Sequence, residues 1–422
     1  MTPYLIPCLN ACGADAWEVT ETLTEGWEFY FIRHALDQHR VRHVTHTVVK
    51  VYKKSEDGTM LGSASSEIHE TAGEEETRGL LSRLLFQASL VRNPVFALHD
   101  PKPVESLEVP AADVASMARD FLETMQQVPE TGGENINSYE IFVSLKTRHF
   151  MNSNGIDLTE TTPDSMMEVV VNARSEGHEI ELYRSYTSGT CDRENLLKDI
   201  TDTLRFGRDR LRTVPTPPIT QAPLILSTSA AVDVYSYFAE RMSAAMKYRR
   251  LSDWKIGQKV SEAPLTVEAV RTLPNSSGNH AFDLEGAPVR DLILIENGTA
   301  RAFWGGQQYG SYLGLKDAFV ADNFSVRGGT ETEEELRSGN WLEVVEFSDF
   351  QVDPMTGDIA GEIRLAYWHD GETTTIVSGG SVSGNMRETP LRFSAETRQY
   401  DTFLIPALTR LETMHVTGID PN

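Results

Sequence analysis

Cysteine is scarce in this sequence: Cys8, Cys12 and Cys191 are the three present in 422 residues. Three cysteines cannot build the disulfide framework of a small secreted domain, and their scarcity favours a reducing compartment. Cys8 and Cys12 would share one face of a helix, but no second pair at zinc-ribbon spacing accompanies them. We therefore expect neither a disulfide-stabilised fold nor a cysteine zinc site.

Basic charge is also in short supply. Lysine and arginine number 38 against 62 aspartates and glutamates, which gives a net charge of −24. The excess of negative charge is spread along the whole chain, and no basic patch interrupts it. Because binding to nucleic-acid phosphates needs clustered Lys and Arg, we expect no nucleic acid among the partners.

Long apolar runs are missing. No stretch of 18 apolar residues occurs, so we expect no membrane span and no membrane partner. The start, "MTPYLIPCLNACGADAW", lacks the basic n-region and apolar core of a signal peptide. These observations together predict a cytoplasmic protein.

A proline-rich stretch divides the chain. The segment "TVPTPPITQAPL" (213–224) holds four prolines, which fix φ and remove hydrogen-bond donors, so it is interpreted as an extended linker. A chain of this length exceeds one ordinary core. We predict an N-terminal subdomain over 1–105, a middle subdomain over 106–220 and a C-terminal domain over 221–422.

The first half alternates between strand and helix patterns. Runs rich in β-branched residues predict strands over 40–52, 139–146, 167–173 and 178–186. Apolar residues at helical spacing predict helices over 75–91, 111–127 and 193–212. Two rounds of strands followed by helix predict an α+β region made of two strand–helix subdomains.

The second half is dominated by short strands. One helix is predicted over 230–250, directly after the short strand "PLILST". The segments that follow are separated by glycine turns, and "ENG" and "HDGE" are typical of hairpins because Asn-Gly and Asp-Gly supply positive φ. We expect a C-terminal domain of antiparallel sheet with one opening helix.

The stretch "EIHETAGEEETRG" (67–79) is similar to a zinc-peptidase motif. His69 and Glu70 match the start of His-Glu-x-x-His, but the second histidine is replaced by Gly73. In the longer form His-Glu-x-x-x-His that histidine is replaced by Glu74, whose carboxylate can bind zinc. The favoured alternative is a capping box in which Thr71 and Glu74 begin a helix. His69 and Glu70 would then precede the helix and share no face with Glu74.

The second half resembles a known family. The segments "SSGNHAFDLEGAPVRDLILIENG" (276–298), "NFSVRGGTETEEEL" (323–336), "VDPMTGDIAGEIRLAYWHDGE" (352–372) and "SGGSVSGNMRE" (378–388) occur in the order typical of the TldD/TldE (PmbA) family, often labelled modulators of DNA gyrase. The resemblance spans roughly 220–420 and is looser in the first half.

The resemblance implies how zinc is distributed in such an assembly. The TldD-type subunit resembles a zinc peptidase, with His-Glu-x-x-x-His on the helix that opens the C-terminal domain and a later cysteine. In this chain Ser236, Tyr237 and Arg241 stand at those positions, and no cysteine follows them. The chain therefore resembles the TldE/PmbA branch: we expect no catalytic residue and no metal ligand in it, and zinc in a TldD-like partner.

The resemblance also implies a role. Such assemblies resemble proteases that act on unfolded peptides in an enclosed cavity, so we expect a non-catalytic subunit that shapes the cavity and binds substrate. Ser383, Gly384 and Asn385 are the predicted peptide contacts, although their glycine could simply make a turn. Two alternatives remain: a stand-alone homo-oligomeric peptide-binding protein, and an active metallopeptidase that uses His69, Glu70 and Glu74.

Overall fold

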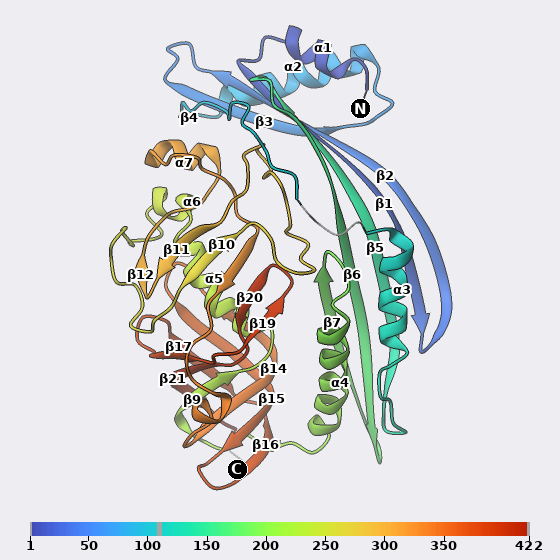
Figure 1. Cartoon of the computed structure of the whole chain (residues 1–422), viewed down its shortest axis with the longest axis vertical. Helices are drawn as coiled ribbons and strands as arrows, with labels where there is room; N and C mark the ends of the chain where they lie inside the picture. The colour runs from blue at the N-terminus through green and yellow to red at the C-terminus, as the bar shows by residue number, and fades with distance from the viewer. Residues whose placement is uncertain (1, 108–111, 420–422) are drawn as a thin grey trace.

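The computed structural model describes residues 2–107 and 112–419, which form three β-sheets with helices packed against them (Figure 1). More residues lie in strands than in helices, and most strand pairs are antiparallel. The α+β class expected from the sequence is thereby confirmed. No helix of the described residues is long and apolar enough to cross a membrane.

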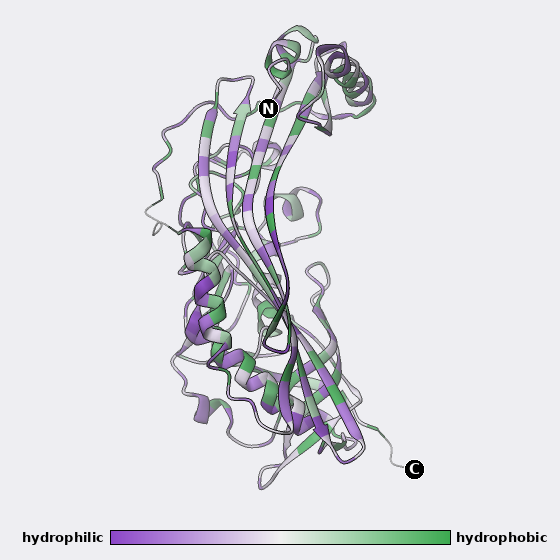
Figure 2. Cartoon of the chain, turned by 90° about the vertical axis from the view of Figure 1, so that its right-hand side faces the viewer, coloured by the Kyte–Doolittle hydropathy of each residue, from purple (hydrophilic) through white to green (hydrophobic). Residues whose placement is uncertain are grey.

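The first half of the chain builds one seven-stranded antiparallel sheet, in the order β4-β3-β2-β1-β5-β6-β7. Its strands are β1 (Ala16–Ile32), β2 (Ala35–Lys54), β3 (Met60–Ile68), β4 (Asn93–Pro94), β5 (Glu134–Asn152), β6 (Asp157–Ser175) and β7 (His178–Ser188). The pairing of β1 with β5 joins the segments predicted as separate subdomains. Along the long strands hydrophilic and hydrophobic residues alternate (Figure 2), as expected for a sheet with one buried face.

Four helices cover this sheet: α1 (Leu5–Ala11), α2 (Glu74–Leu90), α3 (Val114–Met125) and α4 (Arg193–Arg210). The first two pack at one end of the sheet around Leu81 and Leu84, with Val49 and Val51 of β2. The other two pack further along it, around Phe121 and strands β5 and β6. One sheet therefore carries two separate cores. The domain boundaries at 105 and 220 stay predictions.

Helix α2 begins differently from the predicted capping box. Its N-cap is Gly73, which provides no side-chain cap, and Glu74 is already the first helical residue. The Thr71 hydroxyl lies 2.7 Å from Nδ1 of His69 instead of reaching a helix amide. The capping-box interpretation was therefore wrong, because Thr71 lies two residues before the N-cap. His69 and Glu70 do precede the helix, as predicted.

The second half contains two further sheets. The first has the order β12-β11-β10-β13-β20-β19, and the second has the order β14-β9-β21-β17-β15-β16-β8 with β18 beside β21. Their strands are β8 (Val214–Pro215), β9 (Thr220–Leu226), β10 (Val267–Val270), β11 (Leu292–Glu296), β12 (Thr299–Ala300), β13 (Asn323–Val326), β14 (Trp341–Val352), β15 (Asp358–His369), β16 (Thr374–Ser378), β17 (Ser381–Asn385), β18 (Leu391–Phe393), β19 (Thr397–Tyr400), β20 (Phe403–Pro406) and β21 (Thr409–Thr417). Strand β14 also pairs with β15, which closes five strands into a ring.

Helix α5 (Ala231–Arg241) lies in the core of this half. Val234, Tyr235 and Phe238 are almost completely buried among strand residues of the C-terminal sheets. The predicted helix over 230–250 is broken after Arg241, because Ser243 caps a separate short helix, α6 (Ala244–Tyr248), by accepting from the amide of Met246 at 3.2 Å. Two more short helices, α7 (Gln307–Leu313) and α8 (Glu333–Leu336), follow.

The proline-rich stretch 213–224 is extended, as predicted, but it is not a free linker. Strand β8 pairs in parallel with β16 at one edge of the sheet, and β9 lies between β14 and β21. The prolines at 217 and 218 fall between these two strands, where no ladder amide is needed. The stretch thus anchors the first half of the chain to the second.

Candidate functional site

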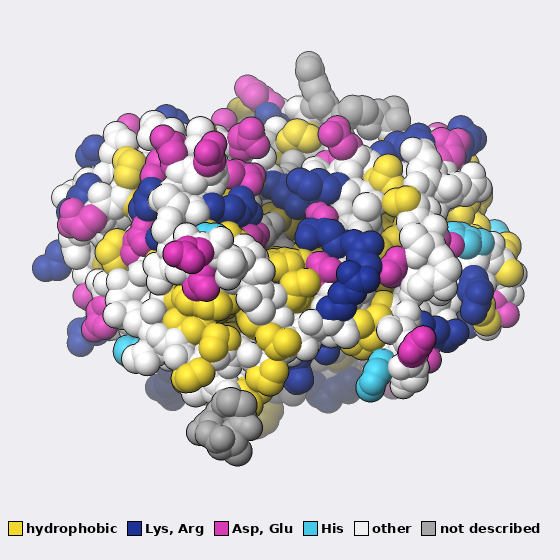
Figure 3. Space-filling model, turned by 90° about the horizontal axis from the view of Figure 1, so that it is seen from below, with side chains coloured by type: hydrophobic (Ala, Val, Ile, Leu, Met, Phe, Trp, Pro, Cys, Tyr) yellow, Lys and Arg dark blue, Asp and Glu magenta, His cyan; other side chains and the backbone are white. Residues whose placement is uncertain are grey.

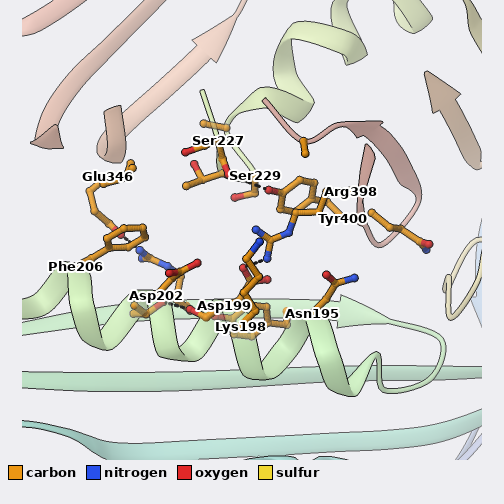
Figure 4. Close-up of a pocket in the computed structure, with 18 of the residues that line it drawn as sticks. Asn195, Lys198, Asp199, Asp202, Phe206, Ser227, Ser229, Glu346, Arg398 and Tyr400 are labelled. Atoms are coloured by element: carbon orange, nitrogen blue, oxygen red, sulfur yellow. Dashed lines mark hydrogen bonds and ion pairs between the residues drawn. The ribbon is translucent and has the colours of Figure 1, made fainter. Parts of the chain in front are cut away.

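A cavity of about 970 Å³ lies between helix α4 and the C-terminal half. Its walls come from β7, α4, the loop after β9, strand β14 and strand β19. Figure 4 shows side chains from these elements pointing toward one another across it. Seen from below, Lys and Arg side chains gather near the middle of the face, next to acidic and hydrophobic ones (Figure 3). The volume of the cavity and its mixture of apolar and polar lining residues are typical of a ligand site.

The amphipathic pattern of α4 places polar side chains in the cavity. Leu196, Ile200 and Leu204 are buried in the core of the first half. The polar residues Lys198 and Asp199 lie between these apolar positions in sequence and line the cavity. The same helix therefore anchors itself with one stripe and forms a cavity wall with another.

Ion pairs cross the cavity between the two halves. Arg398 of β19 pairs with Asp199, although the two residues lie 199 positions apart. Arg184 of β7 pairs with Glu346 of β14 in the same way. The hydroxyl of Ser227 donates to Glu343 at 2.6 Å on the C-terminal side. These contacts hold the walls together and leave charged groups beside the open volume.

Burial shifts the pKa values of several lining groups. Desolvation raises the pKa of the Asp199 carboxyl, and the charge of Arg398 opposes the shift. Desolvation also raises the pKa of Tyr400 to about 12. At the start of α5, burial and the charge of Glu240 raise the pKa of Asp233 to about 6. The cavity is therefore a partly dehydrated site in which ionised groups are costly.

Asp233→Asn is expected to stabilise the protein in a pH-dependent way. Because the folded-state pKa lies above the usual 3.8, the wild type loses stability as the pH rises from about 4 to about 7. The asparagine variant does not titrate, so its advantage grows over that window to about 1 kcal/mol after allowance for partial exposure. Urea unfolding at pH 4 and pH 8 measures it, and an advantage that shrank with rising pH would contradict the assignment.

A guanidinium group lies at the position on α5 where the resemblance implies a zinc motif. Arg241 is fully buried, and its Nη1 donates to the carbonyl oxygens of Pro354 at 3.0 Å and Met355 at 2.8 Å. Its Nη2 pairs with Asp253, and the group lies 4.7 Å from the centre of the Trp254 ring. A permanently charged donor cannot act as a metal ligand. The residues present therefore do not fit a zinc ion.

The predicted peptide contacts lie elsewhere in the sheet. Strand β17 has β15 on one side and β21 on the other. Ser383 is exposed, whereas a Cβ on Gly384 would meet the sulfur of Met414 at 2.6 Å. Asn385 Nδ2 donates to Thr356 at 3.2 Å and Asp358 at 2.8 Å. None of the three lines the cavity in the described part of the chain. Their role as contacts stays a prediction.

His69, Glu70 and Glu74 do not converge. All three are exposed, and Glu74 pairs with Arg78 at 2.7 Å along the helix. The one group of His, Cys, Asp and Glu in the described residues whose atoms could hold a metal ion lies elsewhere, at His99, Asp283 and Glu285. The sequence carried no local signal for that group or for the cavity, because their members lie far apart along the chain.

A family model and several solved structures match this chain. Residues 219–418 match the family model of the PmbA/TldA metallopeptidase C-terminal domain. The chain is similar to the crystal structure of TldE from Thermococcus kodakarensis, with a TM-score of 0.77 and 17% identity over 98% of this chain and 99% of that one. No curated protein matches the chain.

Two further crystal structures share the fold. A Thermotoga maritima protein described as a candidate modulator of a DNA gyrase gives a TM-score of 0.76 and 15% identity, with 98% of each chain covered. A Bacteroides thetaiotaomicron protein described in the same way gives 0.75 and 14% identity, over 99% of this chain and 98% of that one. The shared architecture extends through the whole chain, including the first half.

Proposed function

Because residues 219–418 form a C-terminal domain of the PmbA/TldD family, we propose that this chain is a non-catalytic, TldE/PmbA-like subunit of a TldD/TldE-type metalloprotease. The observation that carries the proposal is Arg241, which occupies the zinc-motif position with a buried guanidinium. Zinc, and the Lewis-acid and water-activating chemistry it supplies, belongs to a TldD-like partner.

The contribution of this chain is a place to bind unfolded peptide. The cavity beside α4 offers apolar contact through Phe206 and Tyr400, and charged groups of both signs. An unfolded segment presents apolar side chains and main-chain amides at once, so a lining of this mixed kind gives affinity with little sequence preference. The bound segment is held while the partner's zinc site cleaves it.

The partner docks on the open edge of the N-terminal sheet. Strand β3 covers β2 from Thr47 onward, so residues 35–46 of β2 pair with β1 alone. This edge exposes Val41, at 71%, together with Leu36. An unpaired strand edge that exposes apolar side chains among its polar ones favours the addition of a strand from another chain. A TldD-like subunit is the occupant we propose, with self-association into a dimer as the second.

Val41→Lys is expected to weaken this assembly, because a charged side chain on a strand edge opposes strand addition. The experiment is co-purification from the native host, with recovery of a His-Glu-x-x-x-His homologue as the readout. Val48→Lys is the matched control, since that exposed valine lies where β3 already covers β2. Equal recovery with both variants would place the interface elsewhere.

A stand-alone, homo-oligomeric peptide-binding protein is the second candidate, and the same open edge favours it. The co-purification separates the two, because self-association alone would yield no zinc-bearing homologue. The cavity and the absence of a zinc motif are compatible with both functions, so they do not discriminate between them. We place either assembly in the cytoplasm, on peptide substrates rather than on nucleic acid or membrane, because the acidic chain repels phosphates.

A further inference from the structure

Three potential metal ligands meet where the two halves of the chain touch. His99 comes from the segment that follows β4, whereas Asp283 and Glu285 come from the loop between β10 and β11. One ligand atom from each lies within 4.8 Å of the other two. A point within about 2.8 Å of all three therefore exists, and movements of less than about 1 Å would bring them to the usual Zn–N and Zn–O distances.

The histidine carries an unused ring nitrogen. His99 is 6% exposed, and its Nε2 is buried without a hydrogen-bond partner among the described residues. The backbone at this position is fixed, because Asn152 Nδ2 donates to the His99 carbonyl at 2.9 Å. A buried, unpaired imidazole nitrogen is costly unless something binds it. One ring nitrogen of His99 lies within 4.8 Å of both carboxylates, so the unpaired imidazole indicates a ligand at this position.

The two carboxylates are held rigidly by backbone amides. Asp283 is completely buried and accepts from the amides of Ala287 at 2.9 Å and Val320 at 2.7 Å. Glu285 accepts from the amide of Gln307 at 2.6 Å. Each carboxylate has about four lone-pair sites, so both keep free sites for a cation. The arrangement is organised before any ion arrives.

The surroundings leave this negative charge under-compensated. The negative charge of the buried Glu18 carboxylate repels that of Glu285. Lys50, the cation paired with Glu18, lies 3.5 Å from the Glu18 carboxylate. Lys102, the nearest lysine along the chain to His99, is paired with Asp317 at 2.6 Å. Buried carboxylates are normally paired or bound to metal. A divalent ion would supply the missing positive charge.

We propose that His99, Asp283 and Glu285 bind one divalent transition-metal ion that joins the segment after β4 to the C-terminal half. An imidazole nitrogen with two carboxylates suits Zn²⁺ or Mn²⁺ better than Ca²⁺ or Mg²⁺, and water completes the coordination. The site shares no residue with the zinc-motif position on α5, and its role is structural. It is independent of the proposed protease function, since the chain alone can be tested.

The test is metal binding by the purified full chain. Protein stripped with chelator is incubated with Zn²⁺ and desalted, and its metal content is measured by mass spectrometry. One Zn²⁺ per chain is expected, together with a rise in Tm of several degrees, because the ion binds the folded state alone. Two variants, Glu285→Gln and His99→Gln, are expected to lose both the bound Zn²⁺ and the rise in Tm. Glu285→Gln keeps an acceptor for the Gln307 amide, so it tests the ligand charge without removing that hydrogen bond.

His46→Gln is the matched control. His46 lies 2.6 Å from Glu67 in an exposed pair, which has the same chemistry without a third ligand. This variant is expected to bind one Zn²⁺ as the wild type does. No bound Zn²⁺ in the wild type would overturn the proposal, and so would retention of the ion and of its Tm shift by both Glu285→Gln and His99→Gln. Loss of the bound Zn²⁺ in His46→Gln alone would also overturn the proposal, because it would assign the ion to the exposed pair of His46 and Glu67.

Discussion

Arg241→Met is expected to lower the free energy of unfolding by about 3 kcal/mol. The substitution removes a completely buried charged donor from the carbonyl groups of Pro354 and Met355, and a hydrogen bond to a charged group contributes about 1.5–3 kcal/mol. It also removes the stacking of the guanidinium on Trp254. The effect is large because Arg241 is completely buried and its one guanidinium makes all of these contacts.

Urea unfolding measures the change, with Arg249→Met as the control. Arg249 is exposed and bonds to the hydroxyl of Tyr309, so its loss should cost about 0.5 kcal/mol or less. Arg241→Lys should fall between the two, because an ammonium cannot reproduce the planar fork. A change below about 1 kcal/mol in Arg241→Met would show that the buried guanidinium does not organise this region.

Ser229→Trp is expected to weaken peptide binding by about tenfold or more. Ser229 is exposed and lines the cavity beside Tyr400, so an indole there takes up volume without disturbing a core. A ligand that loses part of its buried contact loses affinity accordingly. Fluorescence anisotropy of a labelled unfolded peptide measures binding, and the melting temperature reports whether the fold is intact.

Ser383→Trp is the matched control, because it places the same indole at the exposed serine of β17. If the cavity is the site, this variant binds peptide as the wild type does. The reverse result, with binding lost in Ser383→Trp and kept in Ser229→Trp, would move the site to the residues predicted from the sequence.

Local periodicity in the sequence predicted several elements well. Helices α3 and α4 were predicted from their apolar spacing, and the structure places helices over Val114–Met125 and Arg193–Arg210. Strand β1 was missed. Its apolar residues divide between two cores, with Val19 in one and Phe29 against the other. A strand of this kind has no single clean alternation, and its partner β5 lies more than 100 residues away, so the joining of the two halves could not be inferred.

The candidate site was largely beyond sequence analysis. The resemblance showed that Arg241 stands where the zinc motif has a histidine. It did not show that Arg241 is buried or that it donates to two carbonyl groups. The cavity depends on Arg398 meeting Asp199 and on Arg184 meeting Glu346, which are products of the fold. The zinc-like pattern at His69 does not form a metal site for a related reason. His69, Glu70 and Glu74 match the motif in sequence, but they are exposed around the start of a helix and their side chains do not converge.

The most direct test of the account is a peptide-cleavage assay on three samples: this chain alone, its co-purified TldD-like partner alone, and the two combined. The account predicts no cleavage by this chain alone, at any zinc concentration, and cleavage by the combined sample that a chelator abolishes and added zinc restores. Cleavage of an unfolded peptide by this chain alone, lost with chelator and restored by zinc, would contradict the claim that it is a non-catalytic subunit.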